Sequence, residues 1–323
     1  MRRPLRLGLI GTGLAATSLY LPAFKELKGK VQVVACANRT RAKAEAFARL
    51  AKIPTVVGSA EELILLPEVE AVLISLPIDL QPTFVLQALR ANKPVLSEKP
   101  VAPSVSVGKK LLRAASKFGA PWMIGENFAF FDHLHQVVRW VAAGRLGEVR
   151  LVHVTQITNM DRKNPYFKTK WRENPAHVGG FVSDGGVHVA NVVRRCFGMP
   201  TEVRGFTASF DPKLPPIDTA IASMRFESGA LGSWTSCYSA RYDGPYLRIY
   251  GSRANLEVTW DKAVLTDATG KQTVCVSKRN SFSLEFEHFA EVVLRGKVPA
   301  VTPEDALLDL QFVDGLCRGK RAS

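Results

Sequence analysis

Residues 5–16 read LRLGLIGTGLAA, and this stretch decides the fold of the first part of the chain. An apolar run leads into Gly11-Thr12-Gly13, and residues 14–27 then carry apolar side chains at helical spacing. Gly11, Gly13 and Ala16 fit the pattern G-x-G-x-x-G/A, in which a strand passes through a tight turn into a helix. Such a turn offers backbone N–H groups to the phosphates of a dinucleotide, although an ordinary glycine-rich turn is the alternative. The residues expected at the phosphates are Gly11, Thr12, Gly13, Leu14 and Ala15.

Short apolar runs alternate with helix-like segments up to residue 125. The runs lack period-two alternation, which is typical of parallel strands whose two faces are both covered by helices. Pro22 is expected to kink or divide the first helix. Residues 1–125 are therefore predicted to form a doubly wound parallel α/β domain of the Rossmann type. The strands are expected at residues 5–10, 31–37, 55–57, 71–76, 94–96 and 122–124.

The pattern changes after residue 125. Strand-like runs follow one another between residues 149 and 276 with few helices between them, and turn signals such as Ser228-Gly229 separate several of them. Residues 126–323 are therefore predicted to form an α+β domain with a large, mainly antiparallel open sheet, for substrate binding and oligomerisation. Its helices are expected at residues 131–143, 176–197, 284–295 and 303–317, and the C-terminal helix could pack back on the first domain.

The composition restricts the class of protein. The 323 residues are 46% hydrophobic, and no apolar run approaches the roughly 20 residues of a membrane span, so no membrane partner is expected. Five widely spaced cysteines without a Cys-x-x-Cys pair argue against a zinc ribbon and for reduced thiols in a cytoplasmic protein, and no metal site is expected. The net charge of +14 favours anionic partners. Basic and aromatic residues alternate at residues 162–172, as they do in proteins that bind single-stranded nucleic acid. We favour the alternative, a solvated loop beside a substrate pocket, and expect no nucleic-acid partner.

The tip of the second predicted strand indicates which cofactor binds. Enzymes that use NAD place an acidic residue there for the ribose 2′-hydroxyl, whereas this chain has Asn38, Arg39 and Thr40. Arg39 can pair with a 2′-phosphate, and Thr40 can donate a hydrogen bond to it. NADP is therefore the preferred cofactor and NAD the alternative. Arg41 and Lys43 can instead belong to a solvated helix face.

Two further clusters carry chemistry. Ser97-Glu98-Lys99-Pro100 follows a parallel strand, at the sheet edge where ligands bind in open α/β folds, although a lysine there can also be a surface residue. Asp184 and His188 are four residues apart, so on a helix they share a face. A histidine can exchange a proton with a carbinol near neutral pH, and an aspartate can orient it. The alternative is a helix-capping Asp184 beside a core histidine.

The order of these motifs resembles the Gfo/Idh/MocA oxidoreductase family, the group of glucose–fructose oxidoreductase and inositol dehydrogenase. The resemblance covers nearly the whole chain. It includes Gly125-Glu126-Asn127-Phe128, Trp171-Arg172 ahead of Gly179-Gly180, and the helix start at Thr302-Pro303. One departure lies after Pro77, where the family usually has Asn next and His four residues on from the proline. This chain has Ile78 and Gln81 there, which puts the cofactor contacts of that loop in doubt.

The resemblance implies roles for individual residues. Lys99 would polarise the substrate hydroxyl, His188 would be the acid/base and Asp184 would position both, while hydride passes between nicotinamide C4 and the carbinol or ketone carbon of a sugar or polyol. The sheet of the second domain would form a homodimer or homotetramer interface. Further cofactor contacts are expected from Ser75, Leu76, Pro77, Gln81, Glu98, Lys99 and Asn127, and substrate contacts from Tyr166, Trp171, Arg172 and His177.

Two other functions stay open within the same family. Some relatives bind the dinucleotide without reacting and act as regulators, but those tend to lose the lysine or the histidine. Others keep NAD tightly bound and cleave glycosidic bonds through transient oxidation. Because Lys99, Asp184 and His188 are all retained, the sequence favours an ordinary NAD(P)-dependent oxidoreductase acting on CH–OH groups.

Overall fold

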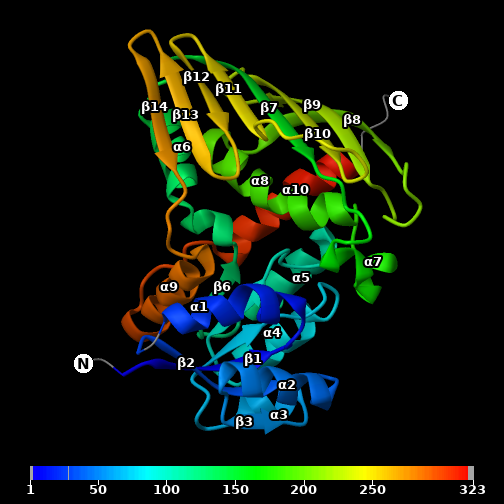
Figure 1. Cartoon of the computed structure of the whole chain (residues 1–323), viewed down its shortest axis with the longest axis vertical. Helices are drawn as coiled ribbons and strands as arrows, with labels where there is room; N and C mark the ends of the chain where they lie inside the picture. Colours follow the sequence, from blue (N-terminus) through cyan, green and yellow to red (C-terminus); the bar gives the residue numbers. More distant parts are fainter. Residues whose placement is uncertain (1–2, 28, 319–323) are drawn as a thin grey trace. The chain divides into compact units, whose positions relative to one another are not determined.

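The computed structural model describes residues 3–27 and 29–318 (Figure 1). The chain divides into two compact units. The first comprises residues 1–127 and 279–307, and the second comprises residues 128–278 and 308–323. Residues 279–307 therefore pack within the first unit, although the sequence had placed the whole of residues 126–323 in the second domain.

The described residues of the first unit form a six-stranded parallel sheet in the order β3-β2-β1-β4-β5-β6. Strand order reverses between β1 and β4, as in a doubly wound fold, so the carboxyl ends of these two strands flank the ligand-binding edge. All residues of β4 and β6 are buried, as expected for strands covered on both faces. The strands are β1 (Leu5–Ile10), β2 (Val31–Ala37), β3 (Thr55–Val57), β4 (Ala71–Ile74), β5 (Val95–Glu98) and β6 (Trp122–Gly125).

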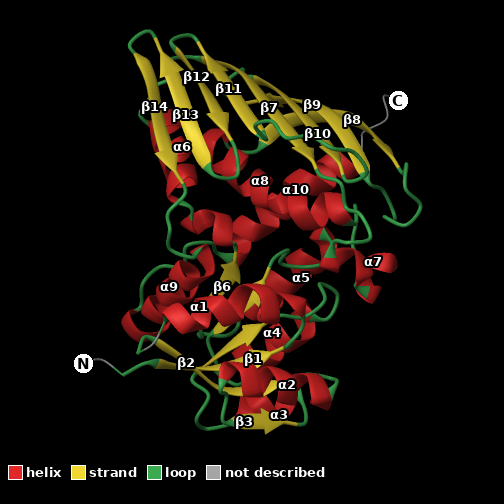
Figure 2. Ribbon diagram, viewed as in Figure 1, coloured by secondary structure: helices red, strands yellow, loops and turns green. Residues whose placement is uncertain are grey.

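Helices lie on both faces of this sheet (Figure 2), which confirms the predicted doubly wound domain. One face carries α9 (Ser281–Arg295), which packs against α1, β1 and β2, and on the other α4 lies between α3 and α5. The edge strand β6 gains a further partner, because the N–H of Ile124 donates to the carbonyl of Val301 at 3.0 Å. The remaining helices are α1 (Leu21–Glu26), α2 (Arg41–Ala51), α3 (Ala60–Leu65), α4 (Gln81–Arg90) and α5 (Val105–Ala115).

The helix that follows β1 changes its winding ahead of Pro22. Residues 16–20 form a π-helical segment, η1 (Ala16–Tyr20), and the N–H of Leu21 donates to the carbonyl of Ala16, five residues back. Proline has no N–H and its ring excludes the carbonyl four residues back, so a widened turn accommodates it. Pro22 was expected to kink or divide this helix, and the structure shows a π-helical segment directly before it.

The described residues of the second unit form an eight-stranded sheet in the order β14-β13-β12-β11-β7-β10-β9-β8. All neighbouring pairs are antiparallel except β7 with β10, so the sheet is mixed but mainly antiparallel, as predicted. The strands are β7 (Val149–Ile157), β8 (Pro200–Ala208), β9 (Thr219–Phe226), β10 (Leu231–Cys237), β11 (Leu247–Gly251), β12 (Ala254–Val258), β13 (Lys262–Asp267) and β14 (Gly270–Cys275).

One face of this sheet is covered by helices and carries the core of the unit (Figure 1). There, Trp234 of β10 packs on Phe312, and Val152 and Val154 of β7 are buried. The helices are α6 (Asp132–Ala142), α8 (Phe181–Phe197) and the end of α10 (Pro303–Arg318), with short segments η2 (Asn127–Phe130), η3 (Pro165–Lys168) and α7 (Lys170–Glu173). No helix in the described part of the chain is long and apolar enough to cross a membrane.

The helix predicted from residue 176 begins only at Phe181. Gly179 and Gly180 adopt φ angles of +80° and +51°, outside the right-handed helical region, and these two residues redirect the chain before the helix starts. The prediction was wrong over residues 176–180 because helical spacing does not reveal such a reversal. The shift matters because it places Asp184 in the first turn of α8.

Candidate active site

The turn after β1 has the geometry of a phosphate-binding loop. Gly11 adopts a φ of +98°, and a Cβ atom there would lie 2.0 Å from the carbonyl oxygen of Ser75. At Gly13, in contrast, a Cβ atom would meet nothing within 4 Å, and the residue is exposed. Packing therefore requires glycine at the first position, while the second leaves open space before the N-terminus of the helix. A phosphate group fits such a space.

The tip of β2 is tied to this turn. The Asn38 side-chain amide donates to the Thr12 hydroxyl at 2.8 Å, and its carbonyl oxygen accepts from the backbone N–H of Thr40 at 3.1 Å. Both ends of the Asn38 side chain are thus used inside the protein, and Thr12 is buried. The structure therefore gives Asn38 a bracing role between the glycine turn and the strand tip.

The two arginines after Asn38 differ in their surroundings. Arg41 pairs with Glu45 across one helical turn, at 2.9 Å, as expected for a solvated helix face. Arg39 is exposed and, among the described residues, takes part in no ion pair. Arg39 is thus the better placed of the two to bind an external anion.

The loop after β4 contains a buried side chain that lacks partners. Ser75, Leu76 and Pro77 are half-buried at the carboxyl end of the strand, and Gln81 follows at the start of α4. Gln81 is 1% exposed, and within the described residues neither its amide nitrogen nor its amide oxygen has a hydrogen-bond partner. An unsatisfied buried polar group costs about 1–3 kcal/mol, so the arrangement fits a ligand that supplies the missing partners.

Lys99 lies at the carboxyl end of β5, beside a carboxylate fixed from two sides. Glu98 accepts a hydrogen bond from the Tyr20 hydroxyl and a second one, at 3.2 Å, from the backbone N–H of Lys99. Burial and the adjacent Glu98 carboxylate raise the pKa of Tyr20 well above its usual range, so Tyr20 remains a hydrogen-bond donor. Lys99 itself is half-buried.

Behind Glu98 lies a second carboxyl group that the sequence did not reveal. Glu285 of α9 is 1% exposed, and its Oε atoms would lie 3.6 and 3.8 Å from a Cβ atom added at Gly125. Burial, together with the carboxylates of Glu98 and Glu126, raises the pKa of Glu285 well above its ordinary value of 4.5. Burial and neighbouring carboxylates both disfavour the ionised form, so the surroundings of Glu285 favour its protonated form.

This leads to a prediction for the Glu285→Gln variant. Because the pKa of Glu285 is higher in the folded chain than in the unfolded chain, folding takes up a proton above pH 4.5 and becomes less favourable as the pH rises. Glutamine is neutral at every pH and removes this penalty. We expect Glu285→Gln to raise the melting temperature more at pH 8 than at pH 5.

Glu287 on the same helix is the matched control. Burial alone would raise its pKa, but hydrogen bonds from Lys30 and Arg279 lower it instead. A depressed pKa contributes stability above the ordinary value, so Glu287→Gln should lower the melting temperature at pH 8. Melting curves in which Glu285→Gln destabilises the protein more at pH 8 than at pH 5 would contradict a raised pKa of Glu285.

Asn127 is the last residue of the N-terminal segment of the first unit. Its side-chain amide donates to the hydroxyl of Ser281 at 3.0 Å, and both residues are buried. The bond joins the end of the β6 segment to the start of α9. The structure therefore shows Asn127 as a tie to α9, a partner that the sequence did not indicate.

In the second unit, Asp184 is held by Arg172. The Nε and Nη2 atoms of Arg172 both donate to Oδ2 of Asp184, at 2.9 and 2.7 Å. The two side chains are only 13% and 10% exposed, so little solvent screens the pair. Arg172 also donates to the Thr169 hydroxyl at 3.1 Å. The aspartate is therefore fixed by a charged partner rather than serving as a helix cap.

Aromatic rings surround the guanidinium group of Arg172. Its Cζ atom lies 3.9 Å from the ring centre of Trp171, 5.0 Å from that of Tyr166 and 5.8 Å from that of Phe181. Aromatic faces at these distances attract the guanidinium cation and restrict the orientation of its plane. Three of the predicted substrate residues thus meet, with the rings of Tyr166 and Trp171 beside the guanidinium group of Arg172.

His177, the fourth predicted substrate residue, is buried beside the same segment. Its Nδ1 atom lies 2.9 Å from the hydroxyl of Ser183, which in turn donates to the carbonyl of Gly180 at 3.1 Å. The rings of His177 and Trp171 are 5.8 Å apart. The sequence did not single out Ser183, which links His177 to the start of α8.

His188 lies one turn after Asp184 on α8 and stacks on an aromatic ring. The centres of the His188 and Phe128 rings are 4.5 Å apart, with 14° between their planes. Trp260 contacts Phe128 edge-on at 6.1 Å and stacks on Tyr246 at 4.6 Å. This row of rings fixes the plane of the imidazole, and nothing in the sequence pattern had indicated it.

The predicted site residues thus form one group in each unit. The first unit holds the glycine turn, the tip of β2, the loop after β4, and Lys99 with Asn127. The second holds Asp184 and His188 on α8 together with Tyr166, Trp171, Arg172 and His177. The first group is that of a dinucleotide-binding domain, and the second presents a fixed carboxylate and a histidine on one helix.

A doubly wound unit with a glycine turn after β1 is the fold of a dinucleotide-binding domain, and this chain joins it to an open-sheet unit. Residues 5–126 match the oxidoreductase family with an NAD-binding Rossmann fold, and residues 139–321 match the C-terminal alpha/beta domain of the same family. The chain belongs to the Gfo/Idh/MocA oxidoreductases. The resemblance seen in the sequence is thereby confirmed.

Known relatives agree with this assignment. The structure of an oxidoreductase from Thermotoga maritima is 35% identical, with a TM-score of 0.93, and the match covers 98% of this chain and 97% of the relative. An aldose-aldose oxidoreductase from Caulobacter crescentus is 25% identical, with a TM-score of 0.86 over 98% and 97% of the two chains. A D-xylose 1-dehydrogenase (NADP(+)) of Haloferax volcanii is 27% identical over 96% and 95%.

Proposed function

We propose that the protein is an NADP(H)-preferring dehydrogenase or reductase that acts on the carbinol or ketone carbon of a sugar, polyol or related molecule. The observation that carries the proposal is Asp184, fixed by Arg172 in the first turn of α8, with His188 one turn further on the same helix. Relatives named as an aldose-aldose oxidoreductase and a D-xylose dehydrogenase support the substrate class.

A nicotinamide held by the first unit would supply the hydride chemistry, at its C4 atom, for the carbinol or ketone carbon of the substrate. Lys99 donates a hydrogen bond to the substrate oxygen, and His188 takes the hydroxyl proton as the carbon loses hydride. Asp184 orients the imidazole and a substrate hydroxyl. Phe128 keeps the imidazole ring in one plane, so the proton acceptor is already oriented when the substrate binds.

The test is a panel of aldoses, polyols and their ketones, incubated with NADP or NADPH and followed by the absorbance of the reduced nicotinamide. We expect cofactor turnover with at least one member. If no member changes the absorbance while NADPH still binds, a regulatory protein would be favoured. Release of free sugar from a glycoside without net change in cofactor would favour the glycosidase.

The preference for NADP rests on Arg39, which is exposed and outside any ion pair of the described residues, and on the absence of a carboxylate at Asn38. Arg39→Ala removes a charged hydrogen-bond donor worth about 1.5–3 kcal/mol, so the Kd for NADPH should rise about tenfold to hundredfold. The Kd for NADH should stay nearly constant, as should both constants in the control variant Arg41→Ala. Equal affinities of the unaltered protein for NADPH and NADH would overturn the preference.

We also propose that copies associate through the uncovered face of the eight-stranded sheet. On neighbouring strands, Tyr250 pairs with Leu151 and Leu151 with Leu231, and all three side chains are exposed. Phe206 and Ile221 form another exposed pair, 85% and 52% exposed. Apolar clusters of this kind mark interaction surfaces. Sedimentation of a single chain at micromolar concentration would contradict the proposal.

For localisation, we propose the cytoplasm. The structure supports a reducing compartment, because all five cysteines are free thiols. Burial raises the pKa of Cys36 to about 11 and that of Cys196 to about 12, so neither is a reactive thiolate at neutral pH. Fractionation of cells that express the protein would test the assignment.

A further inference from the structure

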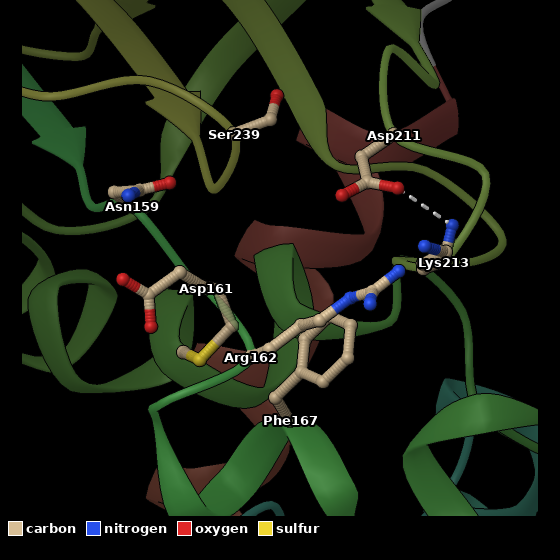
Figure 3. Close-up of a pocket in the computed structure, with 8 residues that line it drawn as sticks. Asn159, Asp161, Arg162, Phe167, Asp211, Lys213 and Ser239 are labelled. Atoms are coloured by element: carbon tan, nitrogen blue, oxygen red, sulfur yellow. Dashed lines mark hydrogen bonds between the residues drawn. The ribbon is translucent and has the colours of Figure 1, made fainter.

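A pocket of about 210 Å³ lies in the second unit, and none of the residues that line it is assigned above to catalysis (Figure 3). The segment after β7, the turn at residues 211–213 and the residue after Tyr238 form its walls. Its side chains belong to one unit only, so the pocket is complete within that unit. The proposed reaction does not use any of them.

The rim of the pocket combines hydrogen-bond donors with acceptors. Arg162 and Lys213 supply positive donors, and among the described residues neither takes part in an ion pair. Asp161 and Asp211 supply acceptors. One oxygen of each carboxylate accepts backbone N–H groups, from Lys163 at 2.8 Å and from Lys213 at 2.9 Å. For the other oxygen of each, the described residues provide no hydrogen bond.

The side chains of this lining suit a neutral ligand that carries several hydroxyl groups. The side chains that line the pocket carry two formal positive and two formal negative charges. A phosphate would meet both carboxylates, which are acceptors only and would repel it. A hydroxyl group, in contrast, both donates and accepts, and can use either kind of side chain. Asn159 adds a neutral amide that also does both, and the Ser239 hydroxyl, which hydrogen-bonds Asp218, adds an acceptor.

The remaining walls are apolar and fit one side of a sugar ring. Phe167 and Met160 line the pocket and pack in the hydrophobic cluster of Phe181 and Tyr238. The volume is below the roughly 300–1,000 Å³ of pockets for drug-sized ligands, so a single ring or a short open chain fits best. Phe181 begins α8, which carries Asp184.

The walls are fixed before any ligand binds. Asp218 is fully buried, and its carboxylate accepts from the backbone N–H groups of Phe210 and Asp211 and from the Thr219 hydroxyl, at 2.6–3.1 Å. Burial alone would raise the pKa of Asp218, but these hydrogen bonds lower it and keep the group ionised. On the other side, the N–H of Met160 donates to the carbonyl of Tyr238 at 2.8 Å. A preformed pocket reduces the entropy lost on binding.

We infer that this pocket is a second binding site, for a neutral sugar ring or polyol, distinct from the place where the substrate carbinol reacts. It recognises hydroxyl groups through Arg162, Lys213 and the two aspartates, and the apolar side of the ring through Phe167. The inference rests on the lining of the pocket and does not depend on the proposed reaction.

Met160 allows a direct test, because it lines the pocket and is one of only five methionines. The whole chain is labelled with ¹³C at the methionine methyl groups, and the Met160 signal is assigned from the Met160→Leu variant. D-glucose, myo-inositol and sorbitol are then titrated separately, without cofactor. We expect at least one of them to shift the Met160 signal saturably, while those of Met123, Met199 and Met224 stay in place.

Variants separate this pocket from unspecific effects. Arg162→Ala with Lys213→Ala should weaken the binding at least about tenfold, because charged hydrogen-bond donors are lost. Lys271→Ala, at an exposed lysine on β14, should leave it unchanged. The inference is overturned if no sugar or polyol shifts the Met160 signal, if the double variant binds as tightly as the unaltered protein, or if inorganic phosphate binds there instead.

The same titration tests the second binding site independently of the proposed reaction. Binding at Met160 is measured without cofactor and needs no turnover. If the pocket stays empty while the panel of sugars still reduces NADP, the second site is wrong and the oxidoreductase stands. If a polyol binds at Met160 but no carbinol or ketone reacts, the proposed reaction is wrong and the second site stands.

Discussion

Replacing Lys99 with methionine is expected to lower kcat by about 10²–10⁴, and replacing His188 with alanine should have an effect of the same size. Methionine keeps the length of the lysine stem but cannot donate a hydrogen bond to the substrate oxygen. Alanine removes the only proposed proton acceptor. Lys99 is one of many expected cofactor contacts, and neither residue belongs to the glycine turn or to the tip of β2, so the Kd for NADPH should change far less than kcat. Steady-state kinetics and a fluorescence titration with NADPH would measure both quantities.

Matched variants guard against general damage to the fold. Lys109→Met alters an exposed lysine of α5, and His153→Ala alters a histidine whose partner is Ser233 on the sheet. Both should keep kcat within about twofold, because surface changes away from a site have small effects. Added imidazole should restore part of the activity of His188→Ala and none of that of Lys99→Met. Normal turnover in both active-site variants would refute the mechanism.

The features that sequence could predict are those set by neighbouring residues. The turn at Gly11 follows from a local pattern, because a positive φ and a close approach to Ser75 both require glycine. The continuous apolar run of β4 predicted a strand buried on both faces, and β4 is wholly buried. Turn signals such as Ser228-Gly229 separated β9 from β10 correctly.

The features that could not be predicted depend on contacts far apart in the sequence. Phe128 meets His188 across 60 residues, and Asn127 meets Ser281 across 154. Periodicity shows that a residue lies on the apolar side of a helix but not which element covers it. For the same reason α9 was assigned to the second domain, although it packs on α1 in the first unit.

Arg172 was predicted to contact the substrate, and the structure shows it paired with Asp184. The expected effect of Arg172→Met follows from this pair. Removing Arg172 deprives a mostly buried carboxylate of the two hydrogen bonds and the positive charge of this pair, which lowers the free energy of unfolding by about 3–5 kcal/mol. Arg172→Lys should recover little of it, because an ammonium group cannot reproduce a guanidinium fork held between aromatic rings. Urea denaturation of the purified variants would measure the loss.

A second buried pair in the same unit separates positioning from plain stability. Arg194 donates to Asp309 at 2.7 Å, with the two side chains 12% and 4% exposed, so Arg194→Met should lower stability by a similar amount. If Arg172 positions Asp184 for the reaction, Arg172→Met lowers kcat strongly while Arg194→Met leaves it nearly unchanged. Combining Arg172→Met with Asp184→Asn should restore much of the stability, since both charges of the pair are then removed together, and none of the activity. Equal effects of the two single variants on kcat would reduce Arg172 to a structural residue.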